Sequence, residues 1–159
     1  MLSKKAKYGL LALLSLAREH GTGPKLIADL AEQEQIPKKF LELILLQLKN
    51  AGILGSRKGK GGGYFLAREP SQITMGSAIR VLDGPLAPVP CVSETAYQKC
   101  PECGDEASCG IRLVMKDVRD AVAEILDREG QPLTNAGGEP VVLECPLPEA
   151  WRALGIDGG

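Results

Sequence analysis

The sequence predicts a mainly α-helical fold: a winged helix-turn-helix domain with a two-stranded wing, followed by a long C-terminal helix. Apolar residues recur at helical spacing in three segments before residue 52. A cationic, glycine-rich segment between two short apolar runs then predicts a β-hairpin. Aromatic residues make up only 4% of the 159 residues, so the core must consist mainly of Leu, Ile, Val and Ala, which favours helices.

Three helices are expected in the first fifty residues. Residues 2–19 contain no proline and place apolar side chains around most of a helix, as expected for an element buried among others. A second helix is expected from Pro24 and a third from Pro37, because proline suits the first helical turn. The third should end near Gly52, a usual C-terminal signal. Two short helices joined by a tight turn form a helix-turn-helix.

Basic residues are concentrated in the first part of the chain. Residues 1–70 hold 12 Lys and Arg against 6 Asp and Glu, whereas residues 71–159 hold 7 against 14. A basic surface of this kind attracts polyanions. Arg57, Lys58 and Lys60 lie at the tip of the expected hairpin, where they can meet phosphates or enter the minor groove of DNA.

The glycine-rich hairpin does not match a nucleotide-binding P-loop. Leu54 stands where the first P-loop glycine is needed, and Gly61 follows Lys60 where Ser or Thr is required. Taken alone, the segment could equally be a solvated turn. Its position after a helix-turn-helix favours a DNA-binding wing.

A cytoplasmic protein with no membrane partner is expected. No apolar run reaches the eighteen or so residues of a membrane span, and Arg18, Glu19 and His20 stand where a secretory cleavage site should follow the first apolar run. The single histidine and the absence of any nucleophile–base pattern argue against an enzyme. In a reducing compartment, clustered cysteines bind metal more often than they form disulfides.

Four of the five cysteines lie close together, as Cys91, Cys100, Cys103 and Cys109. Four thiolates from one loop can complete a tetrahedral metal site. The run CPECG at residues 100–104 is by itself a zinc-knuckle pattern, so a structural zinc site stays open. A protein without a cluster, controlled by thiol redox chemistry or by a protein partner, is the other alternative. Cys145 is expected to be a lone thiol and no ligand.

An apolar seam predicts a helix pair near the end of the chain. Its members recur in steps of three, four, three and four, which is the spacing of two heptads. Packing of this helix against its own domain is the alternative. The seam consists of Ile111, Val114, Val118, Ala121 and Ile125.

Several of these runs together resemble the IscR/NsrR/CymR type of bacterial regulator, also called the Rrf-two family, over roughly residues 1–130. The resemblance rests on IPKKFLE at 36–42, residues 45–54, GKGGGYFLAR at 59–68, ITMG at 73–76 and VLDG at 81–84. It implies a homodimer that binds a palindromic operator in double-stranded DNA through the third helix and the wing. Two-fold symmetry would then place the two recognition helices roughly 34 Å apart.

The resemblance also implies individual DNA contacts. It maps a base-reading Glu onto Glu42 and a minor-groove Arg onto Lys58, where Lys keeps the charge but lacks the planar fork. Leu43 occupies a place where some relatives carry Gln. Lys38 and Lys39 are expected to contact phosphates. The expected DNA-binding residues are Lys38, Lys39, Glu42, Arg57, Lys58, Lys60, Gly61 and Tyr64.

For the cysteines, the resemblance favours an iron-sulfur cluster over zinc. Relatives bind a [2Fe-2S] or [4Fe-4S] cluster through three cysteines of this loop, the last two often separated by five residues, as Cys103 and Cys109 are here. Arg112 and Lys7 stand where relatives have a fourth ligand. Cys100 is the natural substitute, and the cluster would sense iron, oxygen, nitric oxide or redox state.

Four segments are therefore expected. They are a winged helix-turn-helix DNA-binding domain at residues 1–84, a cysteine-rich metal or cluster loop at 85–110, a dimerisation helix at 111–130 and an irregular arm at 131–159.

Overall fold

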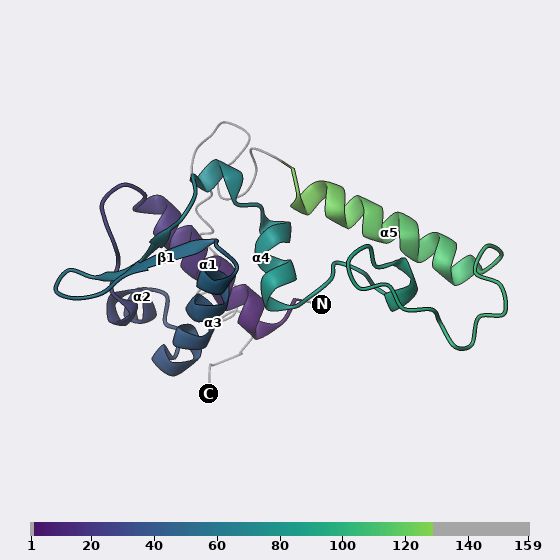
Figure 1. The fold of residues 1–159 in the computed structure, drawn as a ribbon, viewed down its shortest axis with the longest axis horizontal. Coiled ribbons are helices and arrows are strands. Elements are labelled where there is room, and N and C mark those ends of the chain that lie inside the picture. Colours follow the sequence, from purple (N-terminus) through teal and green to yellow (C-terminus); the bar gives the residue numbers. More distant parts are fainter. Residues whose placement is uncertain (1, 129–159) are drawn as a thin grey trace, which may run out of the picture.

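Helices and a small antiparallel sheet form an N-terminal head (residues 2–84) in the computed structural model, which describes residues 2–128 (Figure 1). The mainly helical fold with a two-stranded wing is confirmed. The elements of the head are α1 (Lys4–Arg18), α2 (Ile27–Gln33), α3 (Lys38–Asn50), β1 (Leu54–Arg57), β2 (Gly63–Leu66), a 3-10 turn η1 (Pro70–Gln72) and α4 (Met75–Leu82).

A loop and one long helix extend from the head. The loop contains a second 3-10 turn, η2 (Pro90–Val92), and leads into α5 (Gly110–Leu126). Figure 1 shows α5 reaching away from the head, with the loop lying along it. Within residues 2–128, no helix is long and apolar enough to cross a bilayer. The expected arm at 131–159 lies outside the described residues.

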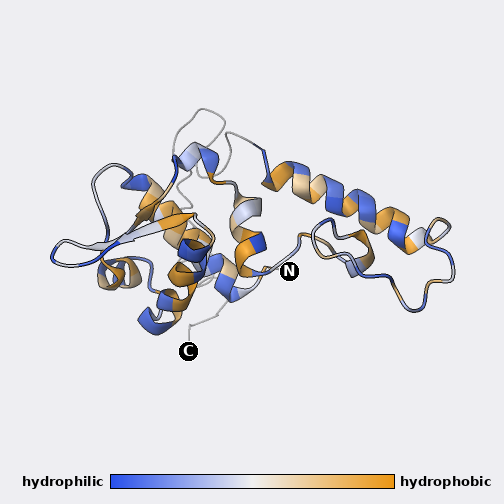
Figure 2. Ribbon diagram, viewed as in Figure 1, coloured by the Kyte–Doolittle hydropathy of each residue, from blue (hydrophilic) through white to orange (hydrophobic). Residues whose placement is uncertain are grey.

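The core of the head lies between α1, α3 and α4. The apolar faces of these helices turn toward one another in Figure 2. As the composition predicts, the largest fully buried side chains are mostly leucines: Leu13, Leu14, Leu30, Leu41, Ile44, Leu45 and Leu48. Gly9 lets α1 approach α4 closely, because a Cβ there would overlap the Leu82 side chain. Burial of this much aliphatic surface is the main stabilising contribution to the head.

Short polar contacts hold the ends of the helices. Ser3 caps α1, because its hydroxyl accepts a hydrogen bond from the Ala6 amide at 3.1 Å. The Ser3 amide donates a hydrogen bond to the Asp83 carboxylate at 2.9 Å. Thr74 caps α4 by accepting the Ser77 amide at 3.0 Å. Such caps satisfy amides that a helix start leaves free. Because Asp83 ends α4, the same contacts also tie the first helix to the fourth.

The second helix begins later than the sequence predicts. It starts at Ile27 and not at Pro24, because Lys25 pairs with Tyr64 of β2 as an extended bridge. The Lys25 amide donates to the Tyr64 carbonyl at 2.8 Å, and the Tyr64 amide donates back at 2.9 Å. Lys25, just before α2, therefore pairs with the wing through a single antiparallel bridge.

Gly63 makes this bridge possible. Its φ is +148°, and a Cβ would overlap the Lys25 carbonyl. We expect Gly63→Ala to lower the free energy of unfolding by about 2 kcal/mol, measured by urea denaturation. Gly59→Ala is the matched control: its φ is also positive at +92°, but no described atom lies within 4 Å of the added Cβ, so about 1 kcal/mol is expected. Equal losses would show that the Lys25 contact is unimportant.

A polar joint connects the head to α5. Arg80 of α4 donates two hydrogen bonds to Asp127, at 2.7 and 2.6 Å, just after α5 ends. The Arg80 guanidinium holds the pKa of the Asp127 carboxyl below its usual range. Gly76 leaves the room for this carboxylate, which a Cβ at that position would overlap. The end of α5 is thus anchored on α4.

Candidate DNA-binding surface and cysteine site

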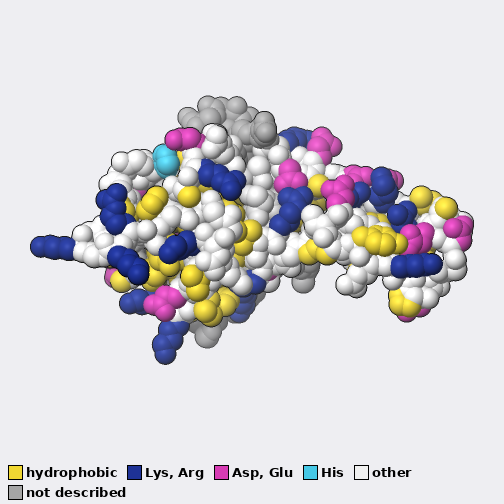
Figure 3. Space-filling model, viewed as in Figure 1, with side chains coloured by type: hydrophobic (Ala, Val, Ile, Leu, Met, Phe, Trp, Pro, Cys, Tyr) yellow, Lys and Arg dark blue, Asp and Glu magenta, His cyan; other side chains and the backbone are white. Residues whose placement is uncertain are grey.

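The exposed edge of α3 and the wing together line one hollow of about 540 Å³, the α3–wing hollow. Five of the expected DNA-binding residues lie there: Lys38, Glu42, Arg57, Lys58 and Tyr64. Figure 3 shows Lys and Arg side chains gathered over this head, whereas acidic and basic side chains alternate along the arm that carries α5. A cationic concave surface beside an exposed helix can receive a polyanion.

The other expected DNA contacts lie outside this hollow. Lys39 projects from a more outward part of α3, and Lys60 and Gly61 form the exposed tip of the wing. Gly61 has a φ of +74°, which favours glycine and turns the tip sharply. Lys49 also lines the hollow, although the sequence analysis did not select it. Its place on the same helical face as Lys38 and Glu42 could have revealed it.

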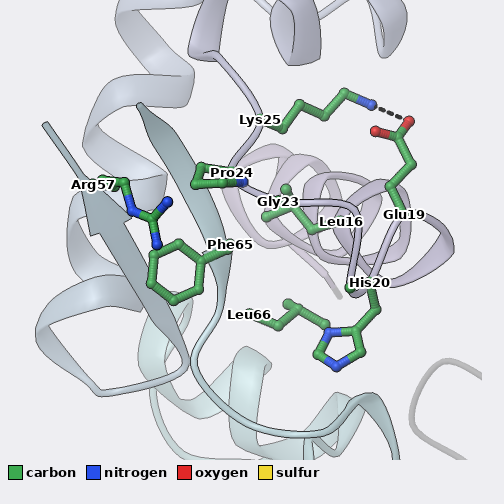
Figure 4. Close-up of a pocket in the computed structure, with 10 residues that line it drawn as sticks. Leu16, Glu19, His20, Gly23, Pro24, Lys25, Arg57, Phe65 and Leu66 are labelled. Atoms are coloured by element: carbon green, nitrogen blue, oxygen red, sulfur yellow. Dashed lines mark hydrogen bonds and ion pairs between the residues drawn. The ribbon is translucent and has the colours of Figure 1, made fainter. Parts of the chain in front are cut away.

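A smaller hollow of about 240 Å³ lies behind the wing (Figure 4). Figure 4 shows Arg57 beside the Phe65 ring on one side and Lys25 facing Glu19 on the other. Lys25 donates to Glu19 at 2.6 Å, to Ser15 at 3.3 Å and to Gln33. The Glu19 carboxylate neutralises the ammonium group, so Lys25 supports the wing and does not add to the charge of the α3–wing hollow.

All four loop cysteines line a third hollow, of about 560 Å³, called here the cysteine hollow. Cys91 is buried in η2, and Cys109 stands directly before the first residue of α5. Cys100 and Cys103 lie on the loop between them and are partly exposed. Three separate stretches of chain therefore bring their thiols to one place.

Cys103 and Cys109 form a close pair. The Cys103 thiol donates to the Cys109 sulfur over 3.4 Å. This hydrogen bond raises the pKa of Cys103 to about 12. The Arg112 backbone amide and the bond from Cys103 lower the pKa of Cys109, as a helix N-terminus does for an anion. Cys109 is therefore the more acidic thiol of the pair, and Cys103 is its hydrogen-bond donor.

Cys100 lies near this pair and also contacts a carboxylate. Cys100 donates to the Glu102 carboxylate at 3.0 Å, which lowers the pKa of Glu102. Among residues 2–128, no group of three or more Cys, His, Asp or Glu side chains is arranged to hold a metal ion. The donor set of four thiols around one hollow suits a thiophilic metal or cluster, but Cys91 and Cys100 would have to approach the pair.

A family model described as "Rrf2: Iron-dependent Transcriptional regulator" matches residues 2–129. The chain belongs to the Rrf2 family. It is 44% identical over 121 residues to an rrf2-like HTH-type regulator of Rhodobacter capsulatus, covering 74% of this chain and 81% of that one. It is 36% identical to the HTH-type transcriptional regulator CymR of Bacillus subtilis, covering 79% of this chain and 83% of CymR.

Solved structures agree with this assignment. The structure of CymR, named as the global cysteine regulator of B. subtilis, gives a TM-score of 0.66 at 37% identity, over 80% of this chain and 89% of that one. The structure of T. potens IscR gives 0.62 at 31% identity, over 80% of each chain. The Rrf2-family chain is therefore a DNA-binding transcriptional regulator of the helix-turn-helix type and not an enzyme.

In this Rrf2-family regulator, Arg112 stands at the edge of the cysteine hollow. Its Nε lies 3.7 Å from Glu106, and the Glu106 carboxylate accepts a hydrogen bond from the Tyr97 hydroxyl at 2.6 Å. Through Glu106, this network connects Tyr97, earlier in the loop, to Arg112 in the first turn of α5. Sequence reasoning missed Tyr97 and Glu106, because no spacing rule relates them.

The apolar seam of the Rrf2-family chain faces solvent. Ile111, Val114 and Ile125 are 69%, 58% and 58% exposed, and Val118 and Ala121 are exposed too. Packing of the seam against its own domain is therefore wrong for the described residues. Within α5 the buried side chain is instead Arg119, which pairs with Glu94 of the loop at 2.5 Å.

Proposed function

We propose that this regulator is a homodimer whose binding to a palindromic operator is modulated by an iron-sulfur cluster held by Cys91, Cys100, Cys103 and Cys109. The observation that carries the proposal is the gathering of these four thiols around one hollow, with two sulfurs 3.4 Å apart at the start of α5. The cluster, when bound, would supply a group whose charge and integrity respond to oxidants, nitric oxide or iron supply.

The chemistry of the donors supports this assignment. Two thiolates on one tetrahedral ion stand about 3.8 Å apart, given metal–sulfur bonds of about 2.3 Å. The Cys103–Cys109 separation of 3.4 Å is close to this value. The amides at the start of α5 and the Arg112 guanidinium favour negative charge on the sulfurs. Cys100 is the fourth thiol, in place of the ligands that relatives carry at the positions of Arg112 and Lys7.

The contacts of the loop supply a route from the cysteines to DNA. Cys109 directly precedes α5, and Glu94 holds Arg119 in the middle of that helix. At the far end of α5, Asp127 is hydrogen-bonded to Arg80 of α4. Helix α4 in turn packs against α1 and α3. A change in the order of the loop would thus shift α5 against the head. In a dimer joined along α5, such a shift changes the spacing of the two α3 helices.

DNA binding through the wing predicts a strong salt dependence. Replacing both Lys58 and Lys60 by Ala should weaken binding to any duplex and lower the slope of log K against log salt by about one for each lost phosphate contact. Lys116→Ala, which removes an exposed lysine from α5, is the control and should leave the slope unchanged. An unchanged affinity and slope in the double variant would rule out the wing as a DNA contact.

Metal analysis of protein purified without oxygen tests the cluster directly. Iron and acid-labile sulfide in equal amounts, with visible absorption, are expected. One zinc without sulfide would contradict the proposal and favour a zinc-stapled loop. Protein without iron, sulfide or zinc would favour a thiol redox regulator if its Cys103 and Cys109 thiols are oxidised to a disulfide by hydrogen peroxide. In that reaction the peroxide is reduced to two waters. The 3.4 Å pair makes this the second candidate.

A further inference from the structure

The outward face of α3 carries two exposed leucines. The helix buries Leu41, Ile44, Leu45 and Leu48 against the core, whereas Leu43 is 62% and Leu46 is 47% exposed. Successive helical residues are rotated by about 100°, which places Leu43 and Leu46 opposite the centre of the buried face. Three residues apart, they form one short apolar ridge on the surface of the helix.

The surroundings of this ridge are cationic. Lys39 lies one turn before Leu43 on the same outward line, and Lys38 and Lys49 flank it on the side of the α3–wing hollow. Arg57 and Lys58 face it from the wing across that hollow. These positive charges complement the phosphates of a nucleic acid. A nucleic acid that covers the two leucines must therefore also present an apolar group to them.

The major groove of DNA offers one apolar group on its base edges, the C5 methyl of thymine. We infer that Leu43 is a specificity-determining residue that packs on the methyl group of a thymine in each half-site. The inference rests on the DNA-binding role of α3 and does not depend on the cysteines or on a cluster.

Glu42 places this thymine within the site. A Glu side chain accepts a hydrogen bond from the exocyclic amine of cytosine. Consecutive residues of a helix rise by about 1.5 Å, less than the 3.4 Å step between base pairs, so Glu42 and Leu43 reach the same or adjacent pairs. The preferred half-site should therefore hold a thymine next to the cytosine bound by Glu42.

Removal of the single methyl tests the contact. The full-length protein is first used to select duplexes from a randomised pool, and each thymine of the selected site is then replaced by deoxyuridine, which lacks only the methyl. One thymine per half-site should show a loss of affinity of about fourfold on replacement, the effect of one buried methyl-sized group. The other thymines should show little change.

Two variants attribute the loss to Leu43. Leu43→Ala should bind the thymine and deoxyuridine duplexes equally and should fold normally, because the site is exposed and Ala is a better helix former. Lys39→Ala, the matched control on the same face, should weaken both duplexes and keep the fourfold difference. A thymine effect that persists in Leu43→Ala, or a wild type that selects no sequence or shows no deoxyuridine effect, would overturn the inference.

Discussion

Replacing Cys109 by Ala is expected to reduce bound iron and sulfide from a full complement to nearly none. Cys109 is the more acidic thiol of the close pair, because amides at the start of α5 lower its pKa. Its removal takes away one ligand and leaves Cys103, 3.4 Å away in the native chain, without its sulfur partner. Iron, sulfide and visible absorption after purification without oxygen measure the effect.

Two further cysteine variants sharpen this test. Cys145→Ala, outside the described residues, should retain the full cluster. Cys100→Ala should lose it if Cys100 is the fourth ligand, because its thiol lines the same hollow as the other three. Full iron content in Cys100→Ala would contradict the four-cysteine site and require another fourth ligand. Full content in Cys109→Ala would reject the site as a whole.

Val114→Glu is expected to convert the proposed dimer to monomers and to lower its affinity for the proposed operator by at least about a hundredfold. Val114 belongs to the seam and is 58% exposed, so the change is tolerated in a single chain. In a helix pair it would bury two carboxylates facing each other, at a cost of several kcal/mol. A monomer binds one half-site only and loses the additional affinity that a dimer gains by binding two half-sites at once. Sedimentation and DNA titration measure both effects.

Leu113→Glu supplies the matched control for the seam. Leu113 is also exposed, at 52%, but it lies on α5 about a quarter-turn or more away from the seam. The same apolar-to-acidic change there should leave the protein dimeric. Dissociation by Leu113→Glu with retention of the dimer in Val114→Glu would show that a different face of α5 forms the contact.

Local sequence determined most of the head. Proline before α3, glycine after it and aliphatic residues at helical spacing predicted α3 to within a residue or two, because these signals act within a few residues of chain. The hairpin was readable for the same reason, from glycines and cations between two apolar runs. The composition, rich in Leu and poor in aromatics, predicted the kind of core that α1, α3 and α4 enclose.

Contacts between distant residues were decided by the tertiary structure. The start of α2 was misplaced because Lys25 pairs with Tyr64, a partner that no local propensity indicates. Periodicity predicted an apolar stripe on α5, but only the packing of the chain decides that this stripe faces solvent while Arg119 is buried. The joint between Arg80 and Asp127 likewise joins residues far apart in sequence.

The cysteine site divides in the same way. Spacing alone identified the four thiols and left zinc, cluster and redox chemistry open, since each uses the same residues. Only the folded chain brings η2, the loop and the first turn of α5 to one hollow, and only there does a helix N-terminus lower the pKa of one thiol of a pair. The residue types determine which kinds of chemistry are available to the site. The distances between the thiols and their electrostatic environment, which select among zinc, cluster and redox chemistry, arise from long-range packing.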